Sequence, residues 1–534
     1  MTNFATLADV PYWAVSILLF VLVYHCVLGP VIFSPLAKVP TPHWSCSFSD
    51  CWILYARFRS KENRTLEAAH RRYGPIIRVG PREVSVNSIE AVKIVYQGGF
   101  EKHGWYSVFN NFGVPCMFSS LQGKHHSVRK RMVSNIYSKS YINRSISQSA
   151  QSDVVINSRL IPTLEESLSN GKECTDGLDV HSLFCAAAME FISAYCFGIQ
   201  RSSNFISDKS YREYWLKLYS TRKGYGFFAQ ELPILSSALR LLGIRLTPGW
   251  VDEANRELEA WCKGLSDATL EDLRKSGPSL DTANDPVVVR TLLAGYEKER
   301  RVHDSASPIY STTLQNPELS IASEVFDHIL AGQETTGVAL TYLSHHLSQS
   351  LHLQALLRAE LRTLRPSMVL QDGRVAMPDS KQLHSLPLLH AMIIETIRRY
   401  APAGGPEPRV VPSPSCRLGM YQIPGRTRIS ASAFNIHRDE RAYPCPEEWD
   451  YTRWLANGYQ GSSPQDACRQ FWGFSSGGRM CLGSNFAMHE MKLIIAAIYS
   501  NYTTHIVNDD GIEQTDMYTG HPKRNALDLR FERV

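Results

Sequence analysis

The fold is decided by the stretch Phe474-Ser475-Ser476-Gly477-Gly478-Arg479-Met480-Cys481-Leu482-Gly483, which has the pattern F-x-x-G-x-R-x-C-x-G. Its glycines let the backbone turn sharply and approach a flat bound group closely. A helix that starts near Leu482 would help to keep the sulfur of Cys481 ionised. Five fixed positions of these residue types should arise by chance in roughly one chain in ten thousand of this length. The stretch therefore predicts that Cys481 is a metal-ligating thiolate.

The other cysteines form no metal-binding pattern. The chain of 534 residues contains 12 cysteines, and we find no CxxC pair and no regular Cys/His spacing of the zinc type. Cysteines within apolar stretches, such as Cys185 and Cys196, are typical of reduced, buried thiols. With 44% hydrophobic and 20% charged residues, the composition is that of an ordinary globular protein. A net charge of +5 is too small to indicate nucleic-acid binding.

An uncharged apolar segment lies at residues 12–33, and it is long enough to cross the ~30 Å hydrocarbon layer as a helix. It predicts a membrane anchor over residues 1–33, with the transmembrane part at about 12–33. Asp9 precedes the segment, and a group of basic residues follows it, which places the body of the chain on the cytoplasmic side; these residues are Lys38, Arg57, Arg59 and Lys61.

Two other interpretations of this segment are a cleaved secretory signal and a buried core helix. No positive charge precedes the apolar run, which disfavours the signal. The segment lies at the extreme terminus before a proline-rich stretch, which disfavours the core helix. That stretch, residues 34–44, predicts a stiff, extended hinge.

Residues 45–534 contain no further convincing linker and no repeat, so they are predicted to form one domain. Helical periodicity dominates at residues 178–197, 254–273, 320–348 and 386–400. Short alternating stretches at 76–79 and 83–86 predict strands. The expected fold class is therefore mainly α with a small β portion. The apolar segment 225–242 is either ordinary core or a second surface that contacts the membrane.

Further motifs accompany the Cys481 stretch in a fixed order along the chain. They are Ala331-Gly332-Gln333-Glu334-Thr335-Thr336, Glu395-Thr396-Ile397-Arg398, Glu407-Pro408-Arg409-Val410-Val411-Pro412 and Pro446-Glu447-Glu448-Trp449-Asp450-Tyr451-Thr452-Arg453-Trp454. Together these motifs resemble those of the cytochrome P-450 superfamily of the microsomal type. Their amino-acid sequences are most similar to those of filamentous-fungal members. The resemblance covers nearly the whole body. It implies the cytochrome P-450 fold, with a single haem-thiolate monooxygenase domain behind one N-terminal transmembrane helix.

The resemblance implies haem b (iron protoporphyrin IX) as the cofactor, with the Cys481 thiolate as axial ligand to the iron. Phe474 would pack against the ligand side of the ring, and Arg479 and Arg409 would bind its propionates. Glu334 and Thr335 would provide the proton relay that O–O cleavage requires. Thr335 can bond to the carbonyl four residues back, and Gly332 would leave space for O2.

The resemblance also covers the segment 125–131, which departs from the family's W-x-x-x-R helix. His126 lies at the tryptophan position and Lys130 at the arginine position, so both are expected to bind the propionates. Arg129 is an alternative donor, and a solvated basic face is an alternative for the whole segment.

In the family's pattern, Glu395, Arg398 and Arg453 form a buried charge network that braces the haem loop. Tyr451 replaces the second proline of the P-x-x-F-x-P-x-R-F pattern. We expect these three charged residues to be structural, because the loss of one would leave a buried charge unpaired.

The predicted function is a haem-dependent monooxygenase that inserts one oxygen atom from O2 into a hydrophobic small molecule, by hydroxylation, epoxidation or a related oxidation, in fungal secondary-metabolite biosynthesis. The alternatives are a haem-thiolate isomerase or dehydratase that does not consume O2, and a non-catalytic haem-binding protein. Expected partners are a separate NADPH-cytochrome reductase, with cytochrome b5 as an optional second donor, and membrane lipid. The reductase would dock near Cys481 on basic residues, namely Lys130, Arg131, Arg469 and Lys492. The resemblance implies a single-pass protein of the endoplasmic reticulum membrane with a cytosolic catalytic domain.

Overall fold

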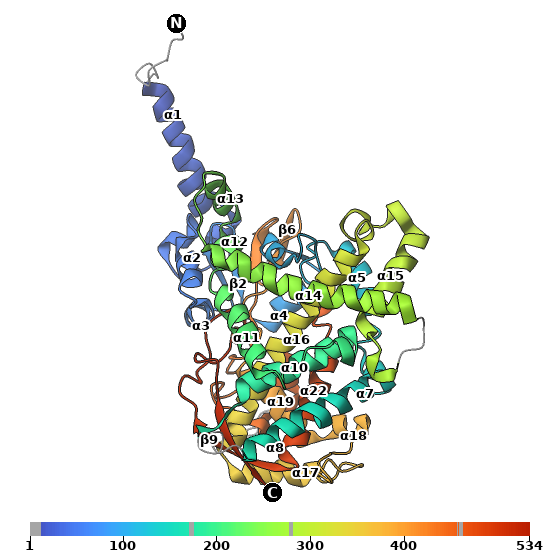
Figure 1. The fold of residues 1–534 in the computed structure, drawn as a ribbon. Helices are drawn as coiled ribbons and strands as arrows, with labels where there is room; N and C mark the ends of the chain where they lie inside the picture. The colour runs from blue at the N-terminus through green and yellow to red at the C-terminus, as the bar shows by residue number, and fades with distance from the viewer. Residues whose placement is uncertain (1–11, 170–175, 277–280, 457, 459–462) are drawn as a thin grey trace.

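A long helix, α16 (Pro317–Ser348), runs through the centre of the computed structural model, which describes residues 12–169, 176–276, 281–456, 458 and 463–534. Pro317 occupies the first turn, where its missing N–H costs no hydrogen bond. Helix α10 (Val180–Phe197) packs along α16 and is buried over its whole length. The two helices form the middle of the largest hydrophobic core, and other helices surround them (Figure 1).

The predicted helical regions are confirmed, with boundaries that differ by a few residues. The region 254–273 lies within α14 (Gly249–Ser276), and 386–400 corresponds to α19 (Pro387–Arg399). Apart from the N-terminal helix, the other α-helices of eight or more residues in the described part of the chain are α2 (Cys51–Phe58), α3 (Glu62–Tyr73), α5 (Gly123–Val133), α7 (Ile146–Val154), α8 (Ile161–Ser169), α11 (Lys209–Lys223), α13 (Pro233–Leu241), α15 (Val287–His303), α17 (Leu351–Leu361) and α22 (Ser484–Tyr499).

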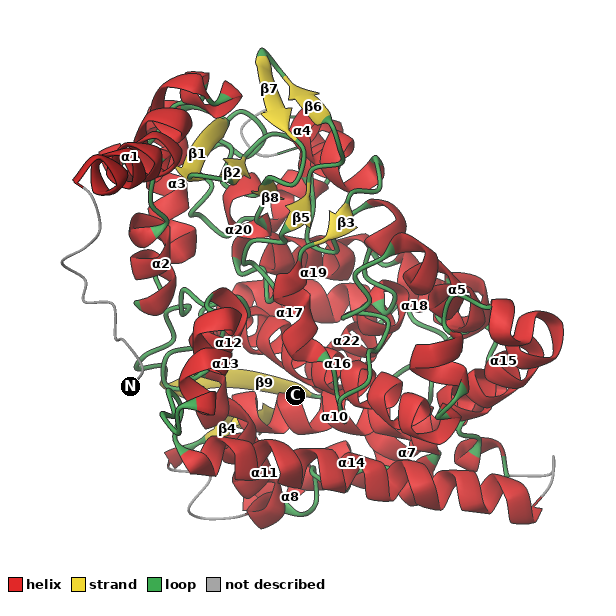
Figure 2. Cartoon of the chain, turned by 90° about the horizontal axis from the view of Figure 1, so that it is seen from above, coloured by secondary structure: helices red, strands yellow, loops and turns green. Residues whose placement is uncertain are grey.

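The β structure of the described residues forms three small sheets. The largest has the order β1-β2-β8-β5-β3, in which only the β2–β8 pair is parallel. It lies to one side of the helical body (Figure 2). The others are β4-β10-β9 and the hairpin β6-β7. The strands are β1 (Ile76–Gly80), β2 (Glu83–Val86), β3 (Glu101–Lys102), β4 (Leu178–Asp179), β5 (Arg409–Val410), β6 (Ser415–Leu418), β7 (Tyr421–Pro424), β8 (Arg428–Ser430), β9 (Tyr502–Asn508) and β10 (Asp528–Arg533).

The apolar N-terminal segment forms a continuous helix that projects from the body (Figure 1). It comprises α1 (Tyr12–Val23) and the π-helical segment Tyr24–Phe33, and it is not buried against the protein. The only other described helix of comparable length and hydropathy is α10, which is fully buried and therefore belongs to the core. The N-terminal helix is the candidate membrane span. The predicted flanking residue Asp9 lies outside the described residues.

The hinge is not extended throughout, so that prediction is wrong for part of it. Pro35–Lys38 forms a 3₁₀ turn that starts with a hydrogen bond from the Leu36 N–H to the Ser34 hydroxyl. Leu36 and Val39 are buried in a hydrophobic cluster that includes residues of the β6-β7 hairpin and of the largest sheet. The burial of these two apolar side chains outweighs the tendency of a proline-rich segment to remain extended and solvated.

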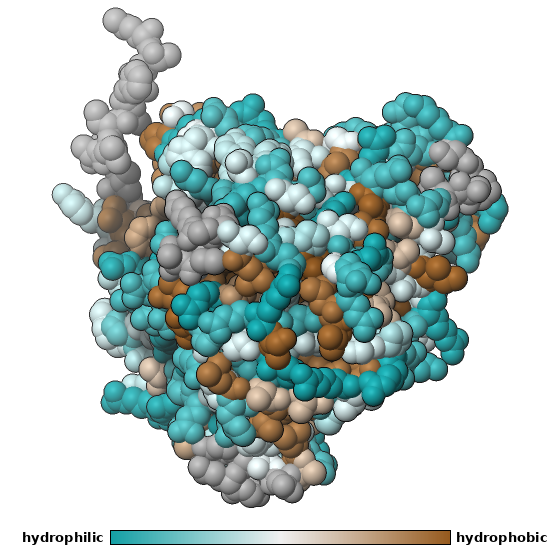
Figure 3. Space-filling model, turned by 60° about the horizontal axis from the view of Figure 1, so that its bottom comes forward, coloured by the Kyte–Doolittle hydropathy of each residue, from teal (hydrophilic) through white to brown (hydrophobic). Residues whose placement is uncertain are grey.

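The segment 225–242 is not core, so that alternative is wrong. It folds into α12 (Phe227–Glu231) and α13 (Pro233–Leu241), and Ile234 is 85% exposed and Leu241 89% exposed. In Figure 1, α13 lies at the end of the body from which the N-terminal helix projects. Figure 3 shows the molecule with its bottom brought forward. On this face, polar and apolar residues are interspersed.

Candidate active site

The Cys481 loop is held in a tight conformation by its backbone. Gly477 has φ +73°, and a Cβ at this position would lie 2.2 Å from the Tyr96 carbonyl oxygen, so only glycine fits. The Cys481 N–H donates to the Phe474 carbonyl at 2.9 Å. Lys130 Nζ donates to two carbonyls of the same loop, those of Gly478 at 2.9 Å and Met480 at 3.2 Å.

The Cys481 side chain is accessible at the surface of its loop, yet protein surrounds it closely. The resulting desolvation raises the pKa of the thiol, while the N–H groups of Gly483 and Ser484 and the charge of Lys130 act in the opposite direction. Helix α22 starts at Ser484, two residues after the predicted start near Leu482. These groups favour the thiolate, and a bound metal ion would deprotonate the sulfur outright.

A cluster of basic side chains lies beside this loop and extends into the interior. Its members, called the basic cluster below, are Lys102, His126, Lys130, Arg409 and Arg479. Burial and then the charges of the other four lower the pKa of His126 to about 2, so its imidazole is neutral. Burial, Arg409 and Arg479 together hold the pKa of Lys102 well below its usual range.

Carboxylates neutralise only part of the basic cluster. Arg409 Nη2 lies 3.2 Å from Glu407 Oε2, and Arg479 Nη2 lies 3.6 Å from Glu101 Oε2. In the described part of the chain, no carboxylate lies within ion-pair distance of Lys102. A buried excess of positive charge is unfavourable unless a bound anion compensates it, so the basic cluster is suited to a ligand that carries carboxylates.

Helix α16 carries the second group of predicted site residues. Most of its central part is buried, but Asp327, Ala331 and Thr335 remain at least partly accessible. Residues four apart share a helix face, so these three form one accessible stripe. The Thr335 hydroxyl donates to the Ala331 carbonyl at 2.8 Å, as expected from the sequence.

Gly332 does not have the expected role of leaving space for O2. A Cβ at this position would lie 3.2 Å from Ile192 of α10, so the glycine permits close packing between α16 and α10. Ala331, on the accessible stripe, is the small residue that faces away from this contact. The sequence did not reveal this packing of Gly332, because spacing alone does not show which face of a helix meets its neighbour.

Glu334 lies next to the stripe and is held by groups from distant segments. Tyr219 of α11 donates its hydroxyl to Glu334 Oε2 at 2.9 Å, and Lys223 of the same helix bonds to Oε1. Thr519 lies 3.3 Å from Oε1 and accepts from Lys223 at 2.7 Å. Burial raises the pKa of Glu334, but Lys223, His521 and the Tyr219 hydrogen bond outweigh it, so the net pKa lies below its usual value. The ion pair with Lys223 therefore keeps Glu334 ionised.

Glu395 is the centre of a fully buried network. Arg398 donates to both of its carboxylate oxygens at 2.8 Å, and Arg453 Nε lies 3.3 Å from Oε1. The Trp454 indole N–H and the Asp450 backbone N–H complete the set, each at 2.9 Å. The structure thus brings together the three residues that were expected to form a structural network.

His437 connects this network to the Cys481 loop. Its Nε2 accepts the Trp472 backbone N–H at 2.9 Å, which leaves Nδ1 to donate to the Arg398 carbonyl at 3.1 Å. Its ring stacks on Phe471, with 5.2 Å between the ring centroids. Burial lowers the pKa of His437 to about 3, so the neutral imidazole can make both contacts. Sequence reasoning missed His437, because no local pattern marks it.

Aromatic residues from separate segments also contact one another. Trp105 lies 5.1 Å from Tyr518 between ring centroids, and the Gly405 N–H donates to the Tyr518 carbonyl at 3.0 Å. Phe118 lies 5.3 Å from Tyr106 in an edge-to-face contact. Trp105 and Gly405, from two separate segments, therefore both contact Tyr518.

A model of the family "Cytochrome P450" matches residues 40–527, which is most of the chain. The chain belongs to the cytochrome P450 family. It is an oxidoreductase of the monooxygenase type, and the cofactor of the family is a haem whose iron is ligated by a cysteine.

Three fungal P450 relatives resemble this chain along nearly its whole length. Cytochrome P450 monooxygenase FGM1 of Gibberella zeae is 25% identical and the match covers 91% of each chain. Cytochrome P450 monooxygenase macH of Penicillium terrestre is 27% identical over 93% of this chain and 92% of the relative. N-acetyltryptophan 6-hydroxylase ivoC of Emericella nidulans is 25% identical over 97% of this chain and 96% of the relative.

The residues of this P450 fit a haem. An accessible thiol lies on a glycine-rich loop, and the basic cluster has the charge excess that two propionates would compensate. Lys102 belongs to that cluster but was missed from the sequence, where it is a single lysine in a short strand, β3. Phe474 lies in the loop and contacts Phe471, with 6.1 Å between ring centroids.

Two details of the sequence interpretation are wrong. Lys492 is 1% exposed and donates to the carbonyls of Leu383 and His384, so it presents no charge to a partner. Helix α22 is buried along most of its length, which the position of one lysine does not reveal. Arg129 is buried, and its Nη1 lies 3.7 Å from Glu324 Oε2, so it is not the alternative propionate donor. The segment 125–131 is therefore not a solvated basic face.

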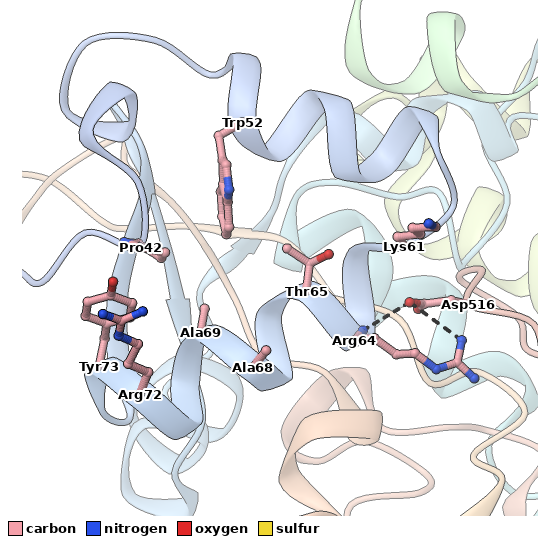
Figure 4. Close-up of a pocket in the computed structure, with 10 residues that line it drawn as sticks. All are labelled: Pro42, Trp52, Lys61, Arg64, Thr65, Ala68, Ala69, Arg72, Tyr73 and Asp516. Carbon is pink, nitrogen blue, oxygen red and sulfur yellow. Dashed lines mark hydrogen bonds and ion pairs between the residues drawn. The ribbon is translucent and has the colours of Figure 1, made fainter.

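The pocket drawn in Figure 4 is separate from these residues. It has a volume of about 680 Å³ and lies between α2 and α3, beside Pro42 of the hinge. At one end of the pocket, the Arg64 backbone N–H donates to Asp516 Oδ2 at 3.0 Å. None of the predicted haem or relay residues lines it.

Proposed function

We propose that this P450 inserts one oxygen atom from O2 into a hydrophobic small molecule, by hydroxylation, epoxidation or a related oxidation, in fungal secondary metabolism. The fungal monooxygenase relatives support this proposal, as does the aromatic contact between Trp105 and Tyr518. The observation that carries it is the accessible Cys481 on a glycine-rich loop next to a buried basic cluster.

In this proposal, bound haem b would supply the activation of O2 and the transfer of oxygen, and the Cys481 thiolate would hold its iron. The Gly483 and Ser484 N–H groups and Lys130 favour the negative charge on the sulfur. Arg409, Arg479, His126 and Lys102 would bind the propionates, and Phe474 would pack against the ring. Lys130 acts mainly through the loop carbonyls to which it donates.

Thr335 and Glu334 control the protons in the proposed reaction. The Thr335 hydroxyl, which donates to the Ala331 carbonyl, can rotate to donate a proton on the accessible stripe. Glu334 is ionised and can accept a proton from water and pass it on. Because Lys223 now holds this carboxylate, proton transfer requires α11 to move or the ion pair to exchange with water.

We propose that residues 1–33 form a single membrane anchor, that 34–44 form the hinge and that 45–534 form the catalytic domain on the cytosolic side of the endoplasmic reticulum. The exposed apolar residues of α13 would enter the same bilayer. Cytochromes P450 generally need a redox partner, and here we propose a separate NADPH-cytochrome reductase, with cytochrome b5 as an optional second donor. The exposed Arg131 and Arg469 are candidates for its docking.

The test is Cys481→Ser, with Cys468→Ser as a matched control, because Cys468 is also an exposed, free cysteine. In the presence of a reductase and NADPH, we expect Cys481→Ser to lose the thiolate CO spectrum and all product that has gained one oxygen. The Cys468 variant should retain both. An unchanged spectrum in Cys481→Ser contradicts the proposed ligand. A product formed without O2 would instead favour the isomerase or dehydratase.

A further inference from the structure

The pocket drawn in Figure 4 is an open trough between α2 and α3. Its floor is one face of α3, since the lining positions 65, 68, 69 and 72 have the i, i+3, i+4, i+7 spacing of a single helix face. Trp52 of α2 forms a wall and points towards this floor. The small side chains of Ala68 and Ala69 leave the space between the two helices open.

A small hydrophobic cluster supports the trough from below. It joins α2, α3 and β1, and its buried members are Ile53, Leu66, Ala69, Ile77 and Val79, with Trp52 and Tyr73 packed against them. Two lining side chains therefore already have fixed positions in the empty trough, so a ligand would not have to order them on binding.

Three cationic side chains line the trough, and all three are exposed. Figure 4 shows Lys61 and Arg64 at one end and Arg72 at the other. Arg64 and Arg72 are eight residues apart on α3, which corresponds to roughly 12 Å along the helix axis. The trough thus has positive charge at both ends and apolar side chains between them.

Of the described residues that line the trough, Asp516 alone is acidic, and its carboxylate is already used. It accepts the backbone N–H groups of Asn63 at 2.9 Å and Arg64 at 3.0 Å, and so caps the start of α3. The same carboxylate lies 3.8 Å from Arg64 Nη1. One carboxylate cannot neutralise three cations, so the trough retains an excess of positive charge.

Lys61 and Arg72 carry this excess. In the part of the chain that the structure describes, neither has a carboxylate within ion-pair distance. The Arg72 guanidinium instead lies over the Tyr73 ring, 5.3 Å from its centroid. A ring contact leaves the charge of the arginine available to an anion.

The trough is fixed near the base of the candidate membrane span. Arg78 of β1 donates from Nη1 to the Pro30 carbonyl at 2.9 Å and from Nη2 to the Ser47 carbonyl at 2.8 Å. Its backbone N–H donates to the Pro40 carbonyl at 2.8 Å. Strand β1 therefore connects the end of the N-terminal helix and the hinge to the cluster that supports the trough.

The residues around the trough are typical of the surface of a bilayer. Trp44, before α2, and Tyr55 and Phe58, on α2, are exposed aromatic residues, and aromatic residues favour the headgroup layer. Basic residues on the cytoplasmic side of a membrane helix attract anionic headgroups. This setting favours a phosphate that is attached to a lipid over a phosphate that is free in solution.

We propose that the trough between α2 and α3 binds the headgroup of an anionic phospholipid from the membrane that holds the N-terminal helix. The inference rests on the proposed membrane attachment and does not depend on the reaction. Lys61, Arg64 and Arg72 hold the negatively charged headgroup, and its glycerol carbons pack against Trp52.

The test uses the full chain in lipid nanodiscs of neutral phosphatidylcholine with a minor share of anionic phosphatidylglycerol. Native mass spectrometry identifies the lipid that stays bound to the released chain. We expect phosphatidylglycerol to be retained at least about fivefold above its share of the disc, since one basic side chain near a membrane strengthens the attraction by about that factor.

Two variants should abolish this enrichment in different ways. The double variant Lys61→Gln/Arg72→Gln removes the excess charge. Ala68→Phe fills the trough and changes no charge. Arg59→Gln is the matched control, because Arg59 is an exposed cation at the end of α2 that does not line the trough, and the enrichment should survive in it.

Retention of the two lipids in proportion to their shares in the disc overturns the inference in the unmodified chain, without any variant. An enrichment that survives Ala68→Phe, or that Arg59→Gln also abolishes, assigns the attraction to a general positive field and overturns the trough as the site. Soluble glycerol 3-phosphate should not displace the retained lipid, and displacement would identify a site for free phosphate esters. A chain that does not enter the discs counts against the membrane anchor, whereas an inserted chain without enrichment counts only against the lipid site.

Discussion

Two buried glutamates on long helices, Glu395 and Glu334, are both paired with cations but in different ways. Two arginines, an indole N–H and a backbone N–H hold Glu395, and the side chains of Glu395 and Arg398 are 0% exposed. One lysine, a phenol and a threonine hold Glu334, and the Lys223 side chain in that pair is 18% exposed.

The difference indicates which of the two glutamates has an ion pair that can dissociate. The arginines around Glu395 form rigid forks that also donate to main-chain carbonyls, such as Pro446 at 2.7 Å from Arg398. Lys223 is a flexible side chain near the end of α11, and only a few contacts fix it. We infer that Glu395 is a permanent brace for the haem loop, and that Glu334 belongs to a contact that can break and re-form.

The largest effect is expected for Glu395→Gln. The substitution leaves Arg398 and Arg453 as uncompensated buried charges, which should destabilise the fold by about 3–5 kcal/mol. Thermal unfolding and haem content per chain would measure the loss. Glu67→Gln is the control, because Glu67 pairs with a 63% exposed Arg71 and should cost less than about 1 kcal/mol. If Glu395→Gln has the same stability as this control, Glu395 is not a brace.

A smaller effect on stability, but a large one on turnover, is expected for Glu334→Gln. The amide still fits between Tyr219 and Lys223 but cannot accept and pass on a proton, so turnover should fall about 10²-fold. The unfolding temperature should change far less than in Glu395→Gln. Product formation per NADPH consumed is the measurement. Unchanged product formation would remove Glu334 from the relay.

Sequence reasoning identified Glu395, Arg398 and Arg453 as partners because short motifs mark each of them. It also predicted the central helices, since their apolar periodicity is a local property of the chain. It could not predict Lys223 as the partner of Glu334, because 111 positions separate them and no pattern in α11 marks that lysine. Lys102 and His437 were missed for the same reason. Lys492 was misjudged because its burial depends on how the other helices pack around α22.

The smallest effect on turnover is expected for Lys223→Met. This variant is also the sharpest test of the ion pair between Glu334 and Lys223. In the unmodified protein the pKa of Glu334 is below its usual value, so its charge stabilises the fold above the unfolded-state pKa, and this contribution is lost only as the pH falls through the lower folded-state pKa. Without Lys223, mainly His521 and the Tyr219 hydrogen bond remain to lower the pKa of Glu334 against the effect of burial. The pKa of Glu334 should therefore rise.

Lys223→Met should therefore change turnover at pH 7.5 only by a few-fold, but turnover should fall on the acid side at a higher pH than in the unmodified protein. Of the neighbours, burial raises the pKa of Tyr219, whereas burial and then Lys223 lower that of His521. The pKa of His521 should therefore also rise in Lys223→Met, and a second variant has to separate its titration from that of Glu334. The pH–rate profile assigns the change to Glu334 if the double variant Lys223→Met/Glu334→Gln lacks the new acid limb. If the single variant keeps the original profile, Lys223 does not control the charge of Glu334, and the proposed contrast with Glu395 fails.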